Sequence, residues 1–274
     1  AERAGCGPPC RQWSEHLLAG LEQDLGGRTV DMLWITHQHS DHLGGVPAVL
    51  ARHAASLYVD NGTRLDTPVV KAARAAAAQR GAPVTVVDPS HPSSPLPSSA
   101  SVTITAVVPE SWPGRCDRHI NDCSIGLRID YCSSSVLFTG DAEADEEAAL
   151  PIDRPVTLLQ VSHHGSETSS SPALLDRVAP RYAVISAADP NEGTNRTYCH
   201  PRKSTVERLT EQLGDPTATM RAFAGNRCRG ATPADWEDVP ASARLYATSR
   251  DGDVVLTTTG DGTFTRVAGE LAQQ

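Results

Sequence analysis

THQHSDHLGG, residues 36–45, places three imidazoles and one carboxylate within six consecutive positions. Imidazole nitrogen suits zinc and other borderline divalent cations, and a carboxylate adds a harder ligand. Four such side chains so close together cannot all reach one ion with good geometry. They can serve two ions about 3.5–4 Å apart, as in two-metal hydrolytic sites. The segment therefore predicts a binuclear metal site.

The flanking residues place this segment on a loop. Residues 30–35 read as an apolar strand, and the glycine pair leads into a helix over residues 46–54. Functional side chains are commonly carried on loops held by such a scaffold. A single histidine is more often a satisfied core or surface residue than a ligand. That interpretation does not account for three histidines and an aspartate in one loop.

Four further segments complete a resemblance to a known family. They are residues 121–124 (NDCS), 138–141 (FTGD), 161–166 (VSHHGS) and 195–201 (NRTYCHP). With the HxHxDH loop, they resemble in order and spacing the motifs of the metallo-β-lactamase fold superfamily. The closest resemblance is to the branch typified by the C-terminal domain of the competence protein ComEC, and it covers residues 30 to 259. It implies an α/β fold, a four-layer αββα sandwich with the metal cleft at one edge of two sheets.

The resemblance also implies a set of metal ligands. The first cation would be bound by His37 and His39, and the second by Asp41, His42 and His163, with Asp141 bridging both. For the third ligand of the first cation, His119 and Asn121 are alternatives. Many ComEC-like sequences carry a carboxylate in place of His39, so an imidazole there favours zinc. Two divalent ions are expected, with zinc preferred and manganese as the alternative at the harder second site.

Several residues are candidates for chemistry. Two metals with a bridging hydroxide would provide a nucleophile at neutral pH. The catalytic candidates are Asp41, His164 and His200, and the substrate-binding candidates are Ser166 and Asn195. His200, which precedes Pro201, is either a general acid or oxyanion contact, or a structural residue. His164 is either an orienting residue, a substrate contact or a solvated neighbour of His163.

The amino-acid composition limits the number of domains and the class of substrate, but less narrowly than the motifs do. Its 274 residues, 39% hydrophobic and 21% charged, suit one α/β domain over residues 1–274, with residues 1–12 as a loop and residues 89–99 as a Pro/Ser-rich surface loop. A net charge of −9 disfavours nucleic acid, although bound cations would reverse the local field for a phosphodiester or other small substrate. No apolar run reaches the length of about 18 residues that a membrane span needs. The oligomeric state is left open.

Seven cysteines are many for a reducing compartment, and none lies in a CxxC pair. They indicate an exported protein with some disulfides, with the cytoplasm as the alternative. The candidate pairs are Cys6–Cys10, Cys116–Cys123 and Cys199–Cys228.

Apolar periodicity predicts strands alternating with helices, beginning with a helix over residues 13–24. Residues 245–248 and 254–259 are expected to form a closing hairpin around residues 250–253. The superfamily normally opens with two or three strands and a D-x-G turn, which the 36 residues before His37 lack. An open sheet edge is a liability, so we expect a truncated N-terminus or an unseen segment.

Three functions follow from these observations. The leading hypothesis is a metal-dependent phosphodiesterase or nuclease, by resemblance to the ComEC-type domain. The alternative enzyme is a hydrolase of esters or lactones, including β-lactams. A non-catalytic, metal-stabilised binding module belongs to a different class, and the missing opening strands favour it while the intact metal motifs oppose it.

Overall fold

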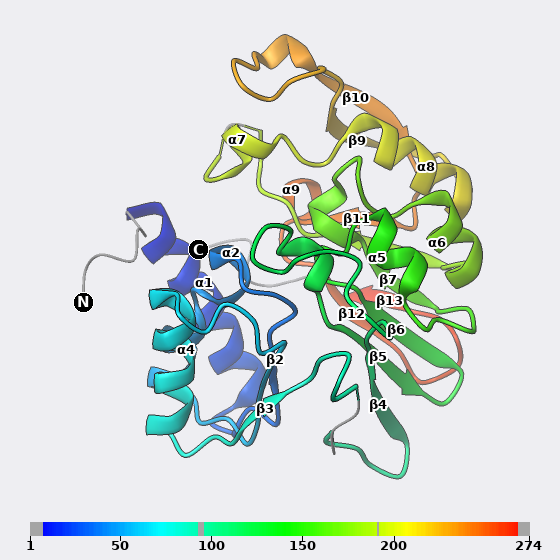
Figure 1. Cartoon of the computed structure of the whole chain (residues 1–274). Coiled ribbons are helices and arrows are strands. Elements are labelled where there is room, and N and C mark those ends of the chain that lie inside the picture. The colour runs from blue at the N-terminus through cyan, green and yellow to red at the C-terminus, as the bar shows by residue number, and fades with distance from the viewer. Residues whose placement is uncertain (1–7, 93–95, 191, 268–274) are drawn as a thin grey trace.

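The structure is a computed structural model that describes residues 8–92, 96–190 and 192–267. Two β-sheets lie face to face, and helices cover the outer face of each (Figure 1). Three separate clusters of buried apolar residues fill the three spaces between these four layers. The predicted αββα sandwich is therefore confirmed.

The first sheet is small and fully parallel. It contains β1 (Leu33–Trp34), β2 (Tyr58–Asp60) and β3 (Val84–Val86), and α3 (Val46–Arg52) and α4 (Pro68–Gln79) pack on its outer face. Side chains alternate across a strand, so Tyr58 joins the helix-side cluster while Val59 lies in the cluster between the sheets. This alternation explains why every residue of β2 is buried.

The second sheet has six strands. β4 (Val102–Val107), β5 (Gly126–Tyr131) and β6 (Ser134–Phe138) form an antiparallel meander, and β7 (Leu158–Gln160), β8 (Tyr182–Ile185) and β11 (Leu245–Ala247) continue it in parallel. Its outer face is covered by α5 (Ala144–Ala149), α6 (Pro172–Val178) and α8 (Lys203–Leu213). α6 begins at Pro172, and the side chain of Ser171 caps its first turn by accepting a hydrogen bond from the amide of Leu174.

A separate hairpin stands above the sheets. β9 (Ala218–Phe223) pairs with β10 (Trp236–Ala241), and the short helix α7 (Asn195–Tyr198) lies beside their connecting loop (Figure 1). The Cys199–Cys228 disulfide joins α7 to that loop. Around it Phe223 and Trp236 form a small apolar cluster. The sequence analysis did not predict this hairpin.

The C-terminal prediction was wrong. β11 does not pair with the strand after it but lies parallel to β8, and α9 (Thr248–Asp251) follows. β12 (Val255–Thr257) pairs instead with β13 (Thr265–Val267). The apolar β11 fills a place in the large sheet, which buries it better than an isolated hairpin would.

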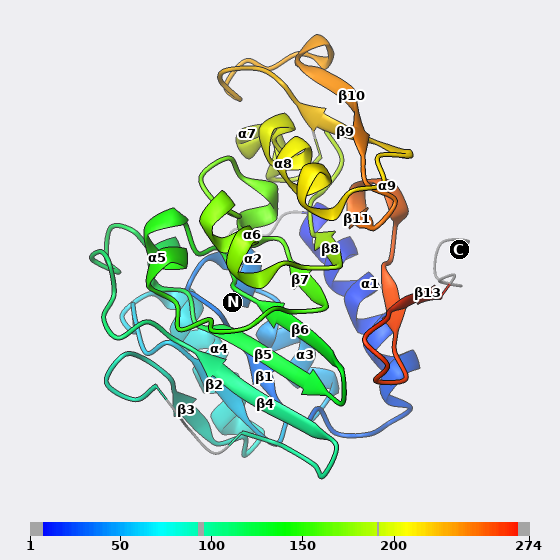
Figure 2. The same ribbon diagram turned by 90° about the vertical axis from the view of Figure 1, so that its right-hand side faces the viewer.

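The N-terminal bounds also differ. The first helix, α1 (Pro8–Leu25), begins within the predicted loop over residues 1–12 and extends beyond the predicted residues 13–24. It lies beside the C-terminal hairpin (Figure 2), where His16 Nε2 is 2.9 Å from a carboxylate oxygen of Asp253. The predicted pairs Cys116–Cys123 and Cys199–Cys228 are present, whereas the pair Cys6–Cys10 is not tested, because Cys6 lies outside the described residues. Within the described residues, no helix combines the length and apolarity needed to cross a bilayer.

Candidate metal centre

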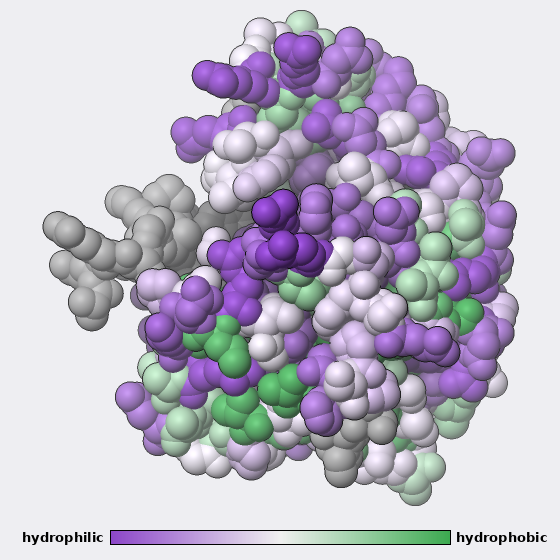
Figure 3. All heavy atoms as spheres, viewed as in Figure 1, coloured by the Kyte–Doolittle hydropathy of each residue, from purple (hydrophilic) through white to green (hydrophobic). Residues whose placement is uncertain are grey.

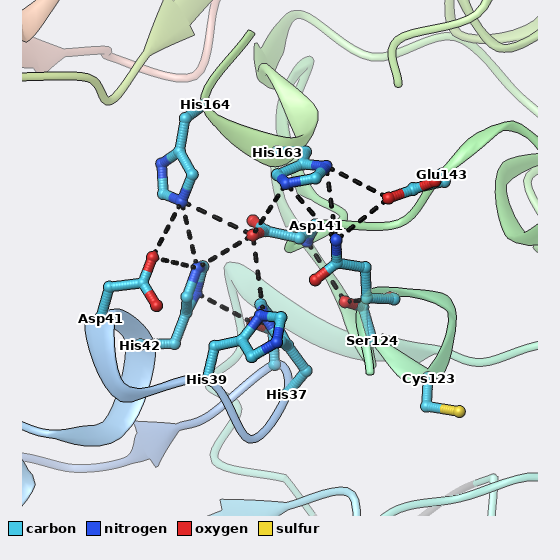
Figure 4. Close-up of polar contacts among 12 residues, drawn as sticks. His37, His39, Asp41, His42, Cys123, Ser124, Asp141, Glu143, His163 and His164 are labelled. Atoms are coloured by element: carbon cyan, nitrogen blue, oxygen red, sulfur yellow. Dashed lines mark hydrogen bonds and ion pairs between the residues drawn. The ribbon is translucent and has the colours of Figure 1, made fainter. Parts of the chain in front are cut away.

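The ends of three strands bring the predicted ligands together (Figure 4). His37 and His39 follow β1 and lead into the short helix α2 (Ser40–Leu43), which carries Asp41 and His42. Asp141 follows β6 and the pair His163–His164 follows β7. The centre therefore draws its side chains from both sheets, at the carboxyl ends of their strands.

Gly140 makes this convergence sterically feasible. Its φ is +61°, and a Cβ added there would lie 2.7 Å from Cβ of Thr36 and 3.0 Å from Oγ of Ser124. Any other residue would be strained by the backbone angle and would collide with the loop from the first sheet. Glycine thus lets the Asp141 loop lie directly against the HxHxDH loop.

Asp141 lies at the middle of the imidazoles. Its Oδ2 is 3.3 Å from Nε2 of His42, 3.6 Å from Nε2 of His37 and 3.5 Å from Nε2 of His164. Its Oδ1 is buried and has no hydrogen-bond partner among the described residues. A carboxylate with one oxygen among several rings and the other unpaired is well placed to bridge two cations.

Two overlapping donor groups surround this aspartate. One contains His37, His42 and Asp141, and the other contains Asp41, His42 and His164. His39 extends the first group, because its Nδ1 is 3.0 Å from Nε2 of His37. The pairing of His164 rather than His163 with Asp41 and His42 differs from the ligand set that the resemblance implies.

The chemistry of these donors fits divalent cations. Nδ1 of His164 is 2.8 Å from the carbonyl oxygen of Ser186, which can only accept a hydrogen bond. In the neutral ring Nε2 therefore carries a lone pair, and it faces Nε2 of His42 at 3.3 Å. The lone pairs of His164 and His42 converge with the carboxylates of Asp41 and Asp141, an arrangement that a shared cation would stabilise. The contact with the Ser186 carbonyl fixes the orientation of the His164 ring, as in known metal sites.

Thr36 orients two more rings from below. Its Oγ1 is 3.1 Å from Nδ1 of His37 and 3.4 Å from Nδ1 of His42. Both rings therefore present Nε2 toward Asp141. The role of Thr36 was not predicted from the sequence, although its position directly before His37 could have indicated a contact with that ring.

His163 faces a different set of neighbours. Its Nδ1 is 3.5 Å from Oε1 of Glu143, and its Nε2 is 4.0 Å from Asp141. The amide of Asn121 donates to Glu143 at 3.0 Å and lies 3.4 Å from Nε2 of His163. Glu143 was not predicted, because a carboxylate two residues after the bridging aspartate has no motif of its own.

The other candidate residues occupy two kinds of position. His119 is exposed and belongs to neither donor group. Asn195 is buried, donating to the carbonyl of His200 at 2.7 Å and accepting from its amide at 2.6 Å. Ser166 is buried, with its hydroxyl 3.0 Å from that of Thr168. The structure thus gives Ser166 and Asn195 partners inside the protein, and their roles as substrate contacts stay predictions.

His200 lies at the rim of the centre. Its ring centroid is 5.4 Å from that of His163 and 6.3 Å from that of His164, and its Nδ1 is buried without a partner among the described residues. Burial, followed by the nearby His163 and His164, lowers its pKa to about 3. The imidazole is therefore neutral at physiological pH.

Electrostatics divides the centre into anionic carboxylates and neutral or cationic rings. Burial opposes ionisation of Asp141 and Asp41, but hydrogen bonds from histidines outweigh it and hold each pKa below its usual range. Burial lowers the pKa of His37 and of His39. Burial also opposes charge on His164, but its contacts with Asp141 and Asp41 raise its pKa to about 10. Positive charge is thus favoured between the two carboxylates, where a cation would sit.

Comparison with known proteins adds a family to this geometry. The sequence model of the metallo-beta-lactamase superfamily matches residues 11–188. Recombination protein 2 of Haemophilus influenzae is 41% identical over 91 residues, which are 32% of this chain and 11% of that protein. ComE operon protein 3 of Bacillus subtilis is 25% identical over 187 residues, or 67% of this chain and 23% of that protein. The chain thus spans less than a quarter of the length of either relative.

Among solved structures, the diiron beta-hydroxylase CmlA from Streptomyces venezuelae aligns with a TM-score of 0.36 and 16% identity. The alignment covers 57% of this chain and 35% of that one, a likeness too low to carry an argument.

Proposed function

The chain belongs to the metallo-β-lactamase superfamily, as a metal-dependent hydrolase with ComEC-like relatives, and from this premise we propose that it is a binuclear phosphodiesterase. The observation that carries the proposal is Asp141, whose Oδ2 lies within 3.6 Å of three imidazoles while its buried Oδ1 has no partner in the described part of the chain. A bridging carboxylate of this kind is what a two-cation centre requires.

The chain's residues divide into two ligand sets under this proposal. His37 and His39 would hold one cation, and Asp41, His42 and His164 the other, with Asp141 shared. When bound, two divalent cations supply an activated water at neutral pH and polarise the bond to be cleaved. The imidazole-rich first set favours zinc, and the carboxylate-containing second set also accepts manganese.

The remaining residues would orient the substrate and its departing oxygen. The imidazole of His200 is neutral and lies beside His163, so it is suited to donate a hydrogen bond from its N–H group to a phosphoryl or leaving-group oxygen. The side-chain amide of Asn195 donates to the carbonyl oxygen of His200 and accepts from its backbone N–H. These two hydrogen bonds fix the backbone that carries the His200 ring. Glu143 would hold His163 and Asn121 in place beside the centre.

Metal content and substrate choice test the proposal. Purified protein should contain two divalent ions and hydrolyse bis-p-nitrophenyl phosphate, and EDTA should abolish turnover until zinc or manganese is restored. Faster hydrolysis of nitrocefin or p-nitrophenyl acetate would favour the β-lactam or ester alternative. Bound metal with no turnover on any of these would favour the binding module.

Two disulfides also support a proposed location. Cys116–Cys123 and Cys199–Cys228 persist in an oxidising compartment, so we propose that this part of the chain works outside the cytoplasm. Thiol titration of protein taken from its native compartment should find these four cysteines blocked until a reductant is added.

A further inference from the structure

The disulfide that adjoins His200 carries a basic rim that the proposed chemistry does not use. We define the basic rim as Arg196, Arg227 and Arg229. Arg196 lies on α7, and the other two flank Cys228, whose sulfur is bonded to Cys199 and lies 3.6 Å from the carbonyl oxygen of Arg196. The disulfide therefore holds three arginines from distant parts of the sequence in one place.

The segments around the basic rim are positively charged, whereas the chain as a whole is negatively charged. Residues 193–203 and 216–234 contain six basic residues and no acidic one, in a chain whose net charge is −9. Arg202, Lys203 and Arg221 are within 4.0 Å of carboxylates. The three arginines of the basic rim are exposed, and among the described residues their side chains form neither ion pairs nor hydrogen bonds. Hydrophilic side chains cover α7 and the loop before β10 (Figure 3).

An exposed aromatic ring lies between the rim and the metal centre. Tyr198 is 56% exposed, so part of its ring is open to solvent. Its ring stacks on that of His200, with centroids 6.2 Å apart and planes inclined by 11°. Because the His200 ring is 5.4 Å from that of His163, a flat group stacked on the outer face of Tyr198 would be separated from His163 by two rings, those of Tyr198 and His200.

We propose that Tyr198 and the basic rim bind single-stranded nucleic acid, with one unpaired base stacked on Tyr198 and the neighbouring phosphates held by the arginines. Aromatic platforms beside positive charge are the usual means of binding single strands. A duplex would not offer a free base face to Tyr198. The proposal rests on the phosphodiesterase function, since it brings a phosphodiester chain to the metal centre. It also answers the objection from net charge, which concerns the whole chain and not this surface.

Binding can be measured apart from cleavage. Fluorescence anisotropy of a labelled dT12 with phosphorothioate linkages, which keep the charge and slow hydrolysis, should report binding by the metal-loaded protein. Tyr198→Leu should weaken binding roughly 5- to 150-fold, the equivalent of about 1–3 kcal/mol of stacking. Tyr198→Phe keeps the ring and should bind like the wild type.

The arginines of the basic rim should make the affinity for a single strand depend on salt concentration. Arg227→Ala/Arg229→Ala should reduce the slope of log K against log salt concentration by about 1.4, since each phosphate contact on a single strand contributes about 0.7. Arg52→Ala/Lys71→Ala removes two exposed basic side chains from α3 and α4, which also form neither an ion pair nor a hydrogen bond among the described residues, and is the matched control, with an unchanged slope.

Each outcome bears on the proposal. It is overturned if Tyr198→Leu binds as tightly as Tyr198→Phe, if the two double-arginine variants have the same slope, or if a duplex binds as tightly as dT12 and with the same loss in Tyr198→Leu. Failure of the wild type to hydrolyse bis-p-nitrophenyl phosphate would instead count against the phosphodiesterase function, because the binding assay needs no turnover.

Discussion

At the scale of single residues, Asp141 would attract both cations and offset the repulsion between them. It is the only carboxylate in the donor group with His37 and His42. Asp141→Ala should therefore remove metal as well as activity, because two cations a few ångströms apart repel strongly without a shared anion. Elemental analysis of the variant should find less than one ion per chain. Retention of two ions would contradict a bridging role.

His163 and His164 are adjacent, yet they point to different neighbours. Both have left-handed backbone angles, and Gly165 after them lets the loop lie against Pro201, which a Cβ there would approach to 2.8 Å. His164→Ala should lower the metal content from two ions to one, because it removes a donor beside Asp41 and His42. His163→Ala should keep two ions. The reverse result would restore the ligand set implied by the family resemblance.

His200 should affect turnover and not metal binding. His200→Ala should leave both ions in place and lower kcat about 10²–10³-fold, the usual cost of losing one donor to a developing negative charge. His200→Gln keeps an N–H donor and should recover part of the loss. Because its pKa is lowered to about 3, the imidazole is neutral throughout the pH range 5–9 and should add no inflection to the pH profile of kcat. Loss of metal in His200→Ala would make His200 a ligand.

At the scale of elements, α5 contains a buried carboxyl group that resists ionisation. Oε2 of Glu146 accepts from the amide of Ser124 at 3.3 Å, and its Oε1 has no partner among the described residues. Burial raises the pKa of Glu146 from its ordinary value of 4.5 to about 9. The group is therefore protonated in the folded chain at neutral pH and ionised in the unfolded chain.

The difference between the pKa of Glu146 in the folded and in the unfolded chain makes the free energy of unfolding depend on pH. Between pH 4.5 and about 9 the folded chain binds the extra proton, so the contribution of Glu146 to the free energy of unfolding falls as pH rises. Glu146→Gln should flatten that fall and, at pH 8, raise the free energy of unfolding by an amount on the order of 2 kcal/mol. Urea denaturation at pH 5 and pH 8 measures it, with the exposed Glu110→Gln as control. Equal pH slopes for wild type and Glu146→Gln would contradict the buried, neutral state.

At the scale of the whole molecule, two disulfides differ in the length of chain they close. Cys116–Cys123 spans 7 residues and Cys199–Cys228 spans 29. The loop-entropy relation gives about 2.5 kcal/mol for the shorter loop and about 3.5 kcal/mol for the longer one. Cys199→Ser/Cys228→Ser should therefore lower the free energy of unfolding more than Cys116→Ser/Cys123→Ser, as measured by urea denaturation. The opposite order would mean that strain or local packing outweighs loop length.

The two variants should also differ in where they disturb function. The longer loop holds the basic rim beside Tyr198, whereas the shorter one encloses Asn121, which contacts His163. Loss of Cys199–Cys228 should weaken binding of a single strand, and loss of Cys116–Cys123 should slow turnover on a small phosphodiester.

The sequence by itself determined the family, the layered fold and the proximity of the first candidate ligands, because these depend on local patterns. Apolar periodicity marks a strand or helix without reference to its partners. His37, His39, Asp41 and His42 share one loop, so their spacing alone brings them together. Gly140 directly precedes Asp141 in the sequence, so the residue that the close approach of the two loops requires is also a local feature.

Tertiary structure decided what depends on contacts between distant residues. The pairing of β11 with β8 places a strand beside one about sixty positions earlier, a choice that the turn signal at residues 250–253 could not reveal. The carbonyl of Ser186 selects His164 over His163 as the ring that faces Asp41. The exposure of the Tyr198 ring and its stacking on His200 depend on tertiary contacts and have no signal in the sequence. In each case the deciding free energy comes from burial or hydrogen bonding with a partner that is far away in the sequence and near in space.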